Sequence, residues 1–149
     1  MQVFIPYLHY VGIMILMGAL IAMHLMLKTD TIKQQLKLVI TVDLFFWLSA
    51  LLVLASGLLR WFVYDPKGTA FFSTNPLFHI KLTLFVIIII LAVFPCLKLR
   101  NWNKQIRQGN DVEIGEKDIK KQLLFIRLEL LLLAIIPLLA VMVALGKGF

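Results

Sequence analysis

Four long apolar runs dominate this chain and limit what it can fold into. Each is close to the roughly 20 residues that a helix needs to cross a hydrocarbon core about 30 Å thick. Composition agrees, because 61% of the residues are hydrophobic and 15% are charged, whereas soluble domains average about 45–50% and about 25%. The sequence predicts an all-α fold in which residues 1–149 form a single domain, a four-helix transmembrane bundle. The expected helices lie at about 4–27, 38–63, 77–97 and 123–145.

Positive charges gather in two of the polar segments, and they give the expected orientation. Segments 28–37 and 98–122 lie on one side of a bundle with four crossings, and they hold most of the 15 Lys and Arg residues. Since Lys and Arg mark the cytoplasmic side of membrane proteins, we expect these loops in the cytoplasm and both termini in the periplasm. The protein is therefore expected to be a multi-pass protein of a bacterial inner (cytoplasmic) membrane. Its net charge of +7 follows from topology and does not indicate nucleic-acid binding.

A histidine and a lysine stand at the start of the third apolar run. Asn75-Pro76 is a helix-start signal, because proline fits the first helical turn. His79 and Lys81 follow within this helix. Ionisable groups are costly to place in a membrane, so they are candidates for function. The only cysteine, Cys96, excludes an intrachain disulfide framework and a multi-cysteine metal site.

His9 and Arg60 lie at the same expected depth as His79 and Lys81. Gly12, beside His9, would leave room for a bulky group, and Gly57 would let another helix or a flat cofactor approach. Two imidazoles on facing helices can bind a haem iron, with Arg60 or Lys81 meeting a propionate. The same histidines could instead bind Cu(I) with the methionines of the first run, relay protons, or bond only to backbone and lipid headgroups.

A second polar set lies near the expected cytoplasmic side. Asp43 or Glu129 could pair with Arg127, since a lone charge in lipid would be expensive. These residues are therefore predicted to form structural ion pairs, and the alternative is a proton path from the cytoplasm. His24, near the same side, is expected to be structural.

Residue patterns in all four runs resemble a family of predicted bacterial inner-membrane proteins. The most specific piece is Asn-Pro-Leu-Phe-His-Ile-Lys-Leu, residues 75–82. At a greater distance, the chain is similar to HemJ-type protoporphyrinogen oxidases, which are small four-helix haem b proteins, and to copper-resistance membrane domains. The resemblance to HemJ-type oxidases implies that His9 and His79 bind haem and that Lys81 is a ligand, a catalytic group or a structural cation. The patterns are Leu8-His9…Gly18, Ser56-Gly57-Leu58-Leu59-Arg60, Phe78-His79-Ile80-Lys81-Leu82 and Arg127-Leu128-Glu129…Pro137.

The sequence thus favours a haem b-binding redox protein that oxidises a porphyrinogen or passes electrons to a membrane carrier. His9 and His79 are the expected metal ligands, with Gly12 and Gly57 beside the cofactor. Lys81 and Arg60 are the candidate catalytic groups. A copper-binding or copper-transporting protein is one alternative, and a non-catalytic accessory subunit is the other. The expected partners are the lipid bilayer and either further copies of the chain or a larger membrane complex.

Overall fold

Four long helices make up most of the protein in a computed structural model, which describes residues 3–28, 32–64, 67–110 and 112–147. In this part of the chain all regular structure is helical, and four of the helices are long and apolar enough to cross a membrane. The elements are α1 (Phe4–Met26), α2 (Ile32–Leu59), the π-helical turn η1 (Arg60–Tyr64), α3 (Gly68–Thr74), α4 (Pro76–Arg107) and α5 (Glu116–Ala144).

The helices are longer than the apolar runs that predicted them. Helix α2 begins at Ile32 rather than near 38, α4 continues to Arg107 rather than ending near 97, and α5 begins at Glu116 rather than near 123. Much of the two expected loops is therefore helical. The polar flanks are rich in Lys, Gln and Leu, which are good helix formers, so the helix continues where the apolar run stops. Between α4 and α5, the chain turns at Gly109, where φ is +78°.

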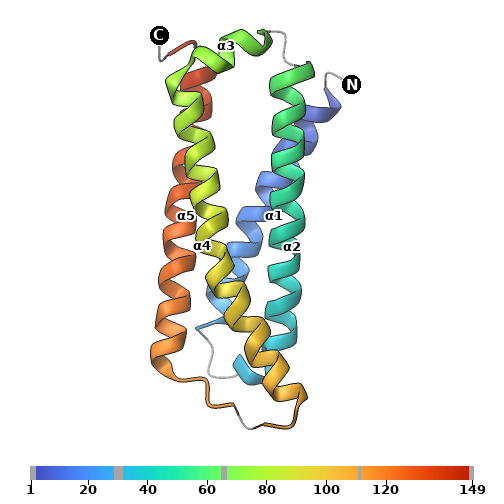
Figure 1. The fold of residues 1–149 in the computed structure, drawn as a ribbon, viewed down its shortest axis with the longest axis vertical. Coiled ribbons are helices and arrows are strands. Elements are labelled where there is room, and N and C mark those ends of the chain that lie inside the picture. The colour runs from blue at the N-terminus through green and yellow to red at the C-terminus, as the bar shows by residue number, and fades with distance from the viewer. Residues whose placement is uncertain (1–2, 29–31, 65–66, 111, 148–149) are drawn as a thin grey trace.

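The long helices form a ring in the order α1, α2, α4, α5, and each packs against its two neighbours. This order is that of an up-and-down bundle, in which α1 and α4, like α2 and α5, are diagonal partners. Figure 1 shows that α1 begins and α5 ends at one end of the bundle, where α3 lies. We call this the α3 end, and we call the opposite end, with the connection from α4 to α5, the loop end.

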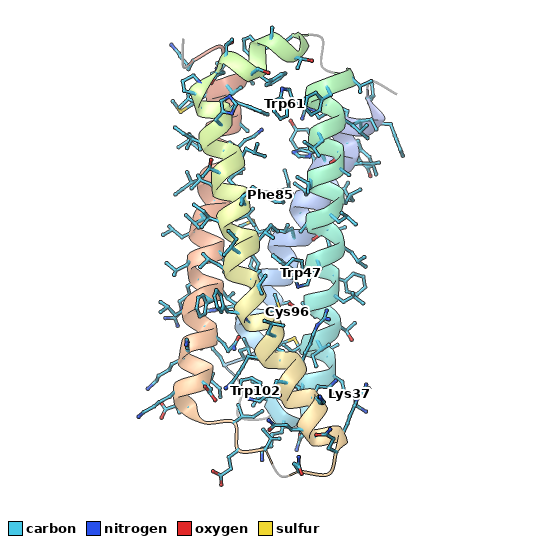
Figure 2. The ribbon with its side chains drawn as sticks, viewed as in Figure 1. Lys37, Trp47, Trp61, Phe85, Cys96 and Trp102 are labelled. Atoms are coloured by element: carbon cyan, nitrogen blue, oxygen red, sulfur yellow. The ribbon has the colours of Figure 1, made fainter. Side chains whose placement is uncertain are left out.

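The packed core fills the middle and the loop end of the bundle. Its fully buried side chains come from all four long helices, whereas many apolar side chains point outward, as expected for helices in contact with lipid. Figure 2 shows Cys96 and Trp102 of α4 toward the loop end, with Phe85 of the same helix nearer the α3 end. Core residues that are at most 1% exposed include Leu16, Leu20, Val39, Phe46, Ile88, Leu99 and Ile126.

Gly12 lies at a close contact between α1 and α2, and it does not leave room for a cofactor. A Cβ atom at this position would lie 2.8 Å from Cγ2 of Val53, so a side chain of α2 already occupies the space. The expected role of Gly12 beside a cofactor is therefore corrected. Its small size allows two helices to pack closely, as small residues often do in membrane proteins.

This contact predicts that Gly12→Ala destabilises the protein. The added methyl group overpacks the α1–α2 contact, which typically costs about 1–3 kcal/mol. Gly18→Ala is the matched control on the same helix, because a Cβ atom there meets nothing within 4 Å. We expect this control to be neutral or to stabilise by up to about 1 kcal/mol. Thermal unfolding in mild detergent, followed by circular dichroism, measures both, and equal stability of the two variants would contradict this account.

Candidate ligand-binding cavity

A cavity of about 410 Å³ lies inside the bundle toward the α3 end. All four long helices contribute to its lining, together with residues of η1 and α3. Sites for small molecules and cofactors typically measure about 300–1,000 Å³. The cavity therefore has the size of a ligand site, and it occupies the part of the bundle that the core side chains do not fill.

The walls of the cavity are mostly apolar. Leu16 of α1, Phe85 of α4 and Leu133 of α5 line it where the packed core begins, and they form what we call its floor. Pro137, inside α5, also lines the wall. Such a surface suits the apolar body of a ligand, and the polar groups that remain determine how a ligand is oriented.

His9 lines the cavity from α1, and its hydrogen bonds define its protonation. Nδ1 lies 3.1 Å from the carbonyl oxygen of Val53 and 2.9 Å from Oγ of Ser56. The Ser56 hydroxyl donates to the carbonyl of Leu52 at 2.6 Å, and a carbonyl oxygen only accepts. Both neighbours of Nδ1 are therefore acceptors, so Nδ1 carries the proton and Nε2 keeps its lone pair.

Gly57 makes room for the His9 ring. A Cβ atom at Gly57 would lie 3.2 Å from Cε1 of His9. This glycine is a place of close approach, as its position suggested, but the group that approaches it is the imidazole of His9. Gly57 also lines the cavity. Its contribution is thus to let His9 lie against α2 while still facing the ligand space.

Basic side chains and an indole N–H line the cavity toward the α3 end. Arg60, Lys67 and Lys81 all contribute, and no Asp or Glu belongs to the lining in the part of the chain that the structure describes. Trp61 also lines the cavity, and its Nε1 is buried without a hydrogen-bond partner among the described residues. Because buried donors are normally paired, this N–H indicates a missing acceptor. This end of the cavity therefore suits an anionic group.

Lys81 lies across the bundle from His9. It is on α4, the diagonal partner of α1, and both residues line the cavity. Its ammonium group lies 5.1 Å from the centre of the Phe78 ring and is close enough to act electrostatically on His9. Of the residues that open α4, Lys81 is the one that the structure brings to His9.

His79 does not share the cavity with His9. Its side chain is exposed, and Nε2 donates to the carbonyl oxygen of Ser73 at 2.8 Å, which ties α4 to α3. The structure thus does not form the expected pair of histidines. Residues 79 and 81 point in nearly opposite directions on a helix, so only one of them can face inward. Packing turns Lys81 inward.

The expected ion pairs of Arg127 are not formed either. Asp43 and Glu129 are buried, whereas Arg127 is exposed. The ion pairs found within the described ranges do not include Arg127. Arg127 and Glu129 are two residues apart, which turns their side chains to different sides of α5.

The copper alternative gains no support from the positions of the methionines. Met17 is 41% exposed, whereas Met23 is 3% exposed and part of the core. These two thioethers therefore do not converge on one site. Among the residues that the structure describes, no group of three or more His, Cys, Asp or Glu side chains could hold a metal ion.

Three residues with a role at the cavity were not identified as site residues from the sequence. Trp61 and Lys67 line the cavity, and Nε1 of Trp61 is buried without a hydrogen-bond partner among the described residues. Ser56 lies outside the lining and orients His9 by a hydrogen bond. Trp61 follows Gly57 by one helical turn and lies on the same helical face, so the small residues of this face could have indicated that Trp61 is near the site. Ser56 gave no such signal, because its role depends on where α1 packs.

Four long apolar helices around an internal cavity define a multi-pass membrane protein. Over residues 1–148 the chain matches the profile of the family described as predicted membrane protein, DUF2214, and it belongs to this family. No curated protein and no solved structure matches it. The distant resemblance to HemJ-type oxidases and to copper-resistance domains therefore gains no support from these comparisons.

Proposed function

We propose that the protein binds haem b in this cavity and acts as a redox protein of a bacterial inner membrane. The observation that carries the proposal is His9, whose Nε2 keeps a lone pair on the wall of a large apolar cavity. Imidazole is a common axial ligand of haem iron. The apolar walls suit the macrocycle, and the donors toward the α3 end suit the two propionates.

In this proposal each polar residue has a separate role. His9 binds the iron, while the Val53 carbonyl and the Ser56 hydroxyl orient its ring, as outer-shell groups commonly do for metal-bound histidines. Lys81 takes the place that the sequence suggested for His79, as the candidate second ligand on the opposite wall. Arg60 and Lys67 bind the propionates, and the N–H of Trp61 gains an acceptor. Bound haem supplies one-electron redox chemistry.

The distribution of Lys and Arg favours an orientation in which the α3 end of the cavity lies toward the periplasm. The reaction would then be porphyrinogen oxidation or electron transfer to a membrane carrier, close to the periplasmic surface. A carrier that dissolves in the bilayer can reach the protein through the lipid-facing surface. Copper binding and a non-catalytic accessory role are the competing functions.

The absorbance spectrum of protein purified in mild detergent from a haem-replete host tests the proposal. We expect a Soret band that shifts on reduction with dithionite, with haem present in proportion to the chain. A featureless spectrum contradicts the proposal. Bound copper without a haem spectrum would favour the copper function, and a stable co-purifying partner with neither would favour the accessory role.

A further inference from the structure

Two carboxyl groups are buried in the bundle beneath the cavity floor. Asp43 of α2 is 3% exposed and Glu129 of α5 is 1% exposed. Helices α2 and α5 are diagonal partners in the ring, so the two side chains approach each other through the interior. Glu129 is four residues, about 6 Å along the helix axis, from Leu133 at the floor. The carboxyls thus lie between the cavity and the loop end.

The groups around this pair do not include a cation bound to it. On α4, the Cys96 thiol is hydrogen bonded to Asp43, while Arg100 has an exposed side chain and acts on Asp43 only through its electrostatic field. On α1, Nδ1 of His24 is buried without a hydrogen-bond partner among the described residues. Arg127, on α5, is exposed. Neither carboxyl has a bound cation among the described residues, and Asp43 is the charged group that acts on Glu129.

Glu129 also has an unsatisfied oxygen. Its Oε1 is buried without a hydrogen-bond partner in the described part of the chain. Buried polar atoms of native proteins are normally satisfied by protein or by ordered water. This oxygen therefore marks a place where a proton or a water molecule completes the structure.

One more buried polar side chain lies on α5 between Glu129 and the surface at the loop end. Gln122 is two helical turns from Glu129 on the same face of α5, and its buried Oε1 has no hydrogen-bond partner among the described residues. Gln122 also lines a groove of about 420 Å³ between α4 and α5. The groove contains the ion pair between Lys98 and Asp118, whose side chains are 37% and 41% exposed. Water at this groove is therefore near Gln122, the buried polar side chain between the loop end and Glu129.

We propose that Asp43 and Glu129 together hold one proton and form a proton-exchange site between the groove at the loop end and the floor of the cavity. Two ionised carboxylates without a bound cation would be strongly disfavoured in this interior, whereas two carboxyls that share a proton carry one charge. The exchange is acid–base chemistry alone. A hydronium ion gives its proton to a carboxylate oxygen and becomes water, and the carboxyl returns the proton to a base. This site does not depend on what the cavity binds.

Infrared spectroscopy of the purified protein tests the proposal. At neutral pH we expect a carbonyl band of a protonated carboxylic acid that shifts in D2O. Glu129→Gln or Asp43→Asn removes this band. Glu113→Gln is the matched control, because Glu113 is exposed, and it leaves the band unchanged. Absence of the band in the unmodified protein, or its persistence in both core variants, overturns the proposal.

A second measurement covers the case in which the core variants do not fold. Dicyclohexylcarbodiimide is an apolar reagent that takes the proton of a carboxylic acid and bonds to its oxygen, and the adduct rearranges to a stable acylurea. Peptide mass spectrometry of the unmodified protein should locate this adduct at Glu129 or Asp43. No adduct at either residue overturns the proposal. Neither readout requires bound haem, so the failure of one proposal is distinguishable from the failure of the other.

Discussion

We expect His9→Ala to remove the haem spectrum that we propose for the purified protein, and His79→Ala to retain it. The first change deletes the imidazole that lines the cavity, and the second deletes an exposed ring that is hydrogen bonded to the Ser73 carbonyl. Loss of an outer-shell partner alone typically lowers metal affinity by about 10–100-fold, so loss of the ligand should cost at least about 100-fold. Haem titration of the two purified variants, followed at the Soret band, measures the difference.

This comparison separates the cavity from the simpler hypothesis of two histidine ligands. If both variants lose haem equally while both remain folded, His79 is a ligand and the arrangement described for the cavity is wrong. If both bind haem as the unmodified protein does, His9 is not the ligand. Circular dichroism of each variant provides the control for folding.

Ala140→Trp blocks ligand binding without changing any polar group. Ala140 lines the cavity from α5, so an indole at this position fills space that the ligand needs. Overpacking costs about 1–3 kcal/mol, which corresponds to roughly fivefold to 150-fold weaker binding if the ligand bears the cost. The same haem titration measures the effect.

Ala134→Trp is the matched control for this substitution. Ala134 is on the same helix, but it is exposed on the outside of the bundle, where an indole contacts lipid or detergent. We expect its haem affinity to equal that of the unmodified protein. Equal loss in both variants would mean that the indole disturbs α5 in general, and unchanged binding in Ala140→Trp would place the ligand outside the cavity.

The number of long helices could be predicted because bilayer thickness sets the length of an apolar run, whereas the short helix α3 was not predicted. The ends of the long helices could not be predicted, since a run marks where the apolar surface stops, whereas a helix continues through any good helix formers that follow. Helix α4 illustrates the difference, because it extends through a charged segment to Arg107. The turn after α4 is marked in the sequence by Gly109, because glycine adopts the positive φ found there without steric cost.

The depth of each candidate site residue was predictable, but its direction around the helix was not. His9, Arg60, Lys81 and Gly57 do line one cavity. His79 has nearly the same depth as Lys81 and points elsewhere, because packing against neighbouring helices sets the rotation of α4. On α5, packing likewise sets the rotation of the helix, so that Glu129 is buried and Arg127 is exposed. Gly12 shows a related limit, since a glycine allows close approach without identifying what approaches.

Pro137 leaves a polar main-chain group in the mostly apolar wall of the cavity. Because proline has no N–H, the main-chain carbonyl of Leu133, one turn earlier in α5, lacks its helical donor. Both residues border the cavity, so this carbonyl lies next to the ligand space. Within a bilayer such an oxygen must find another donor. The cavity should therefore contain a fixed point of hydration, where a water molecule or a hydroxyl group of the ligand bonds to the Leu133 carbonyl.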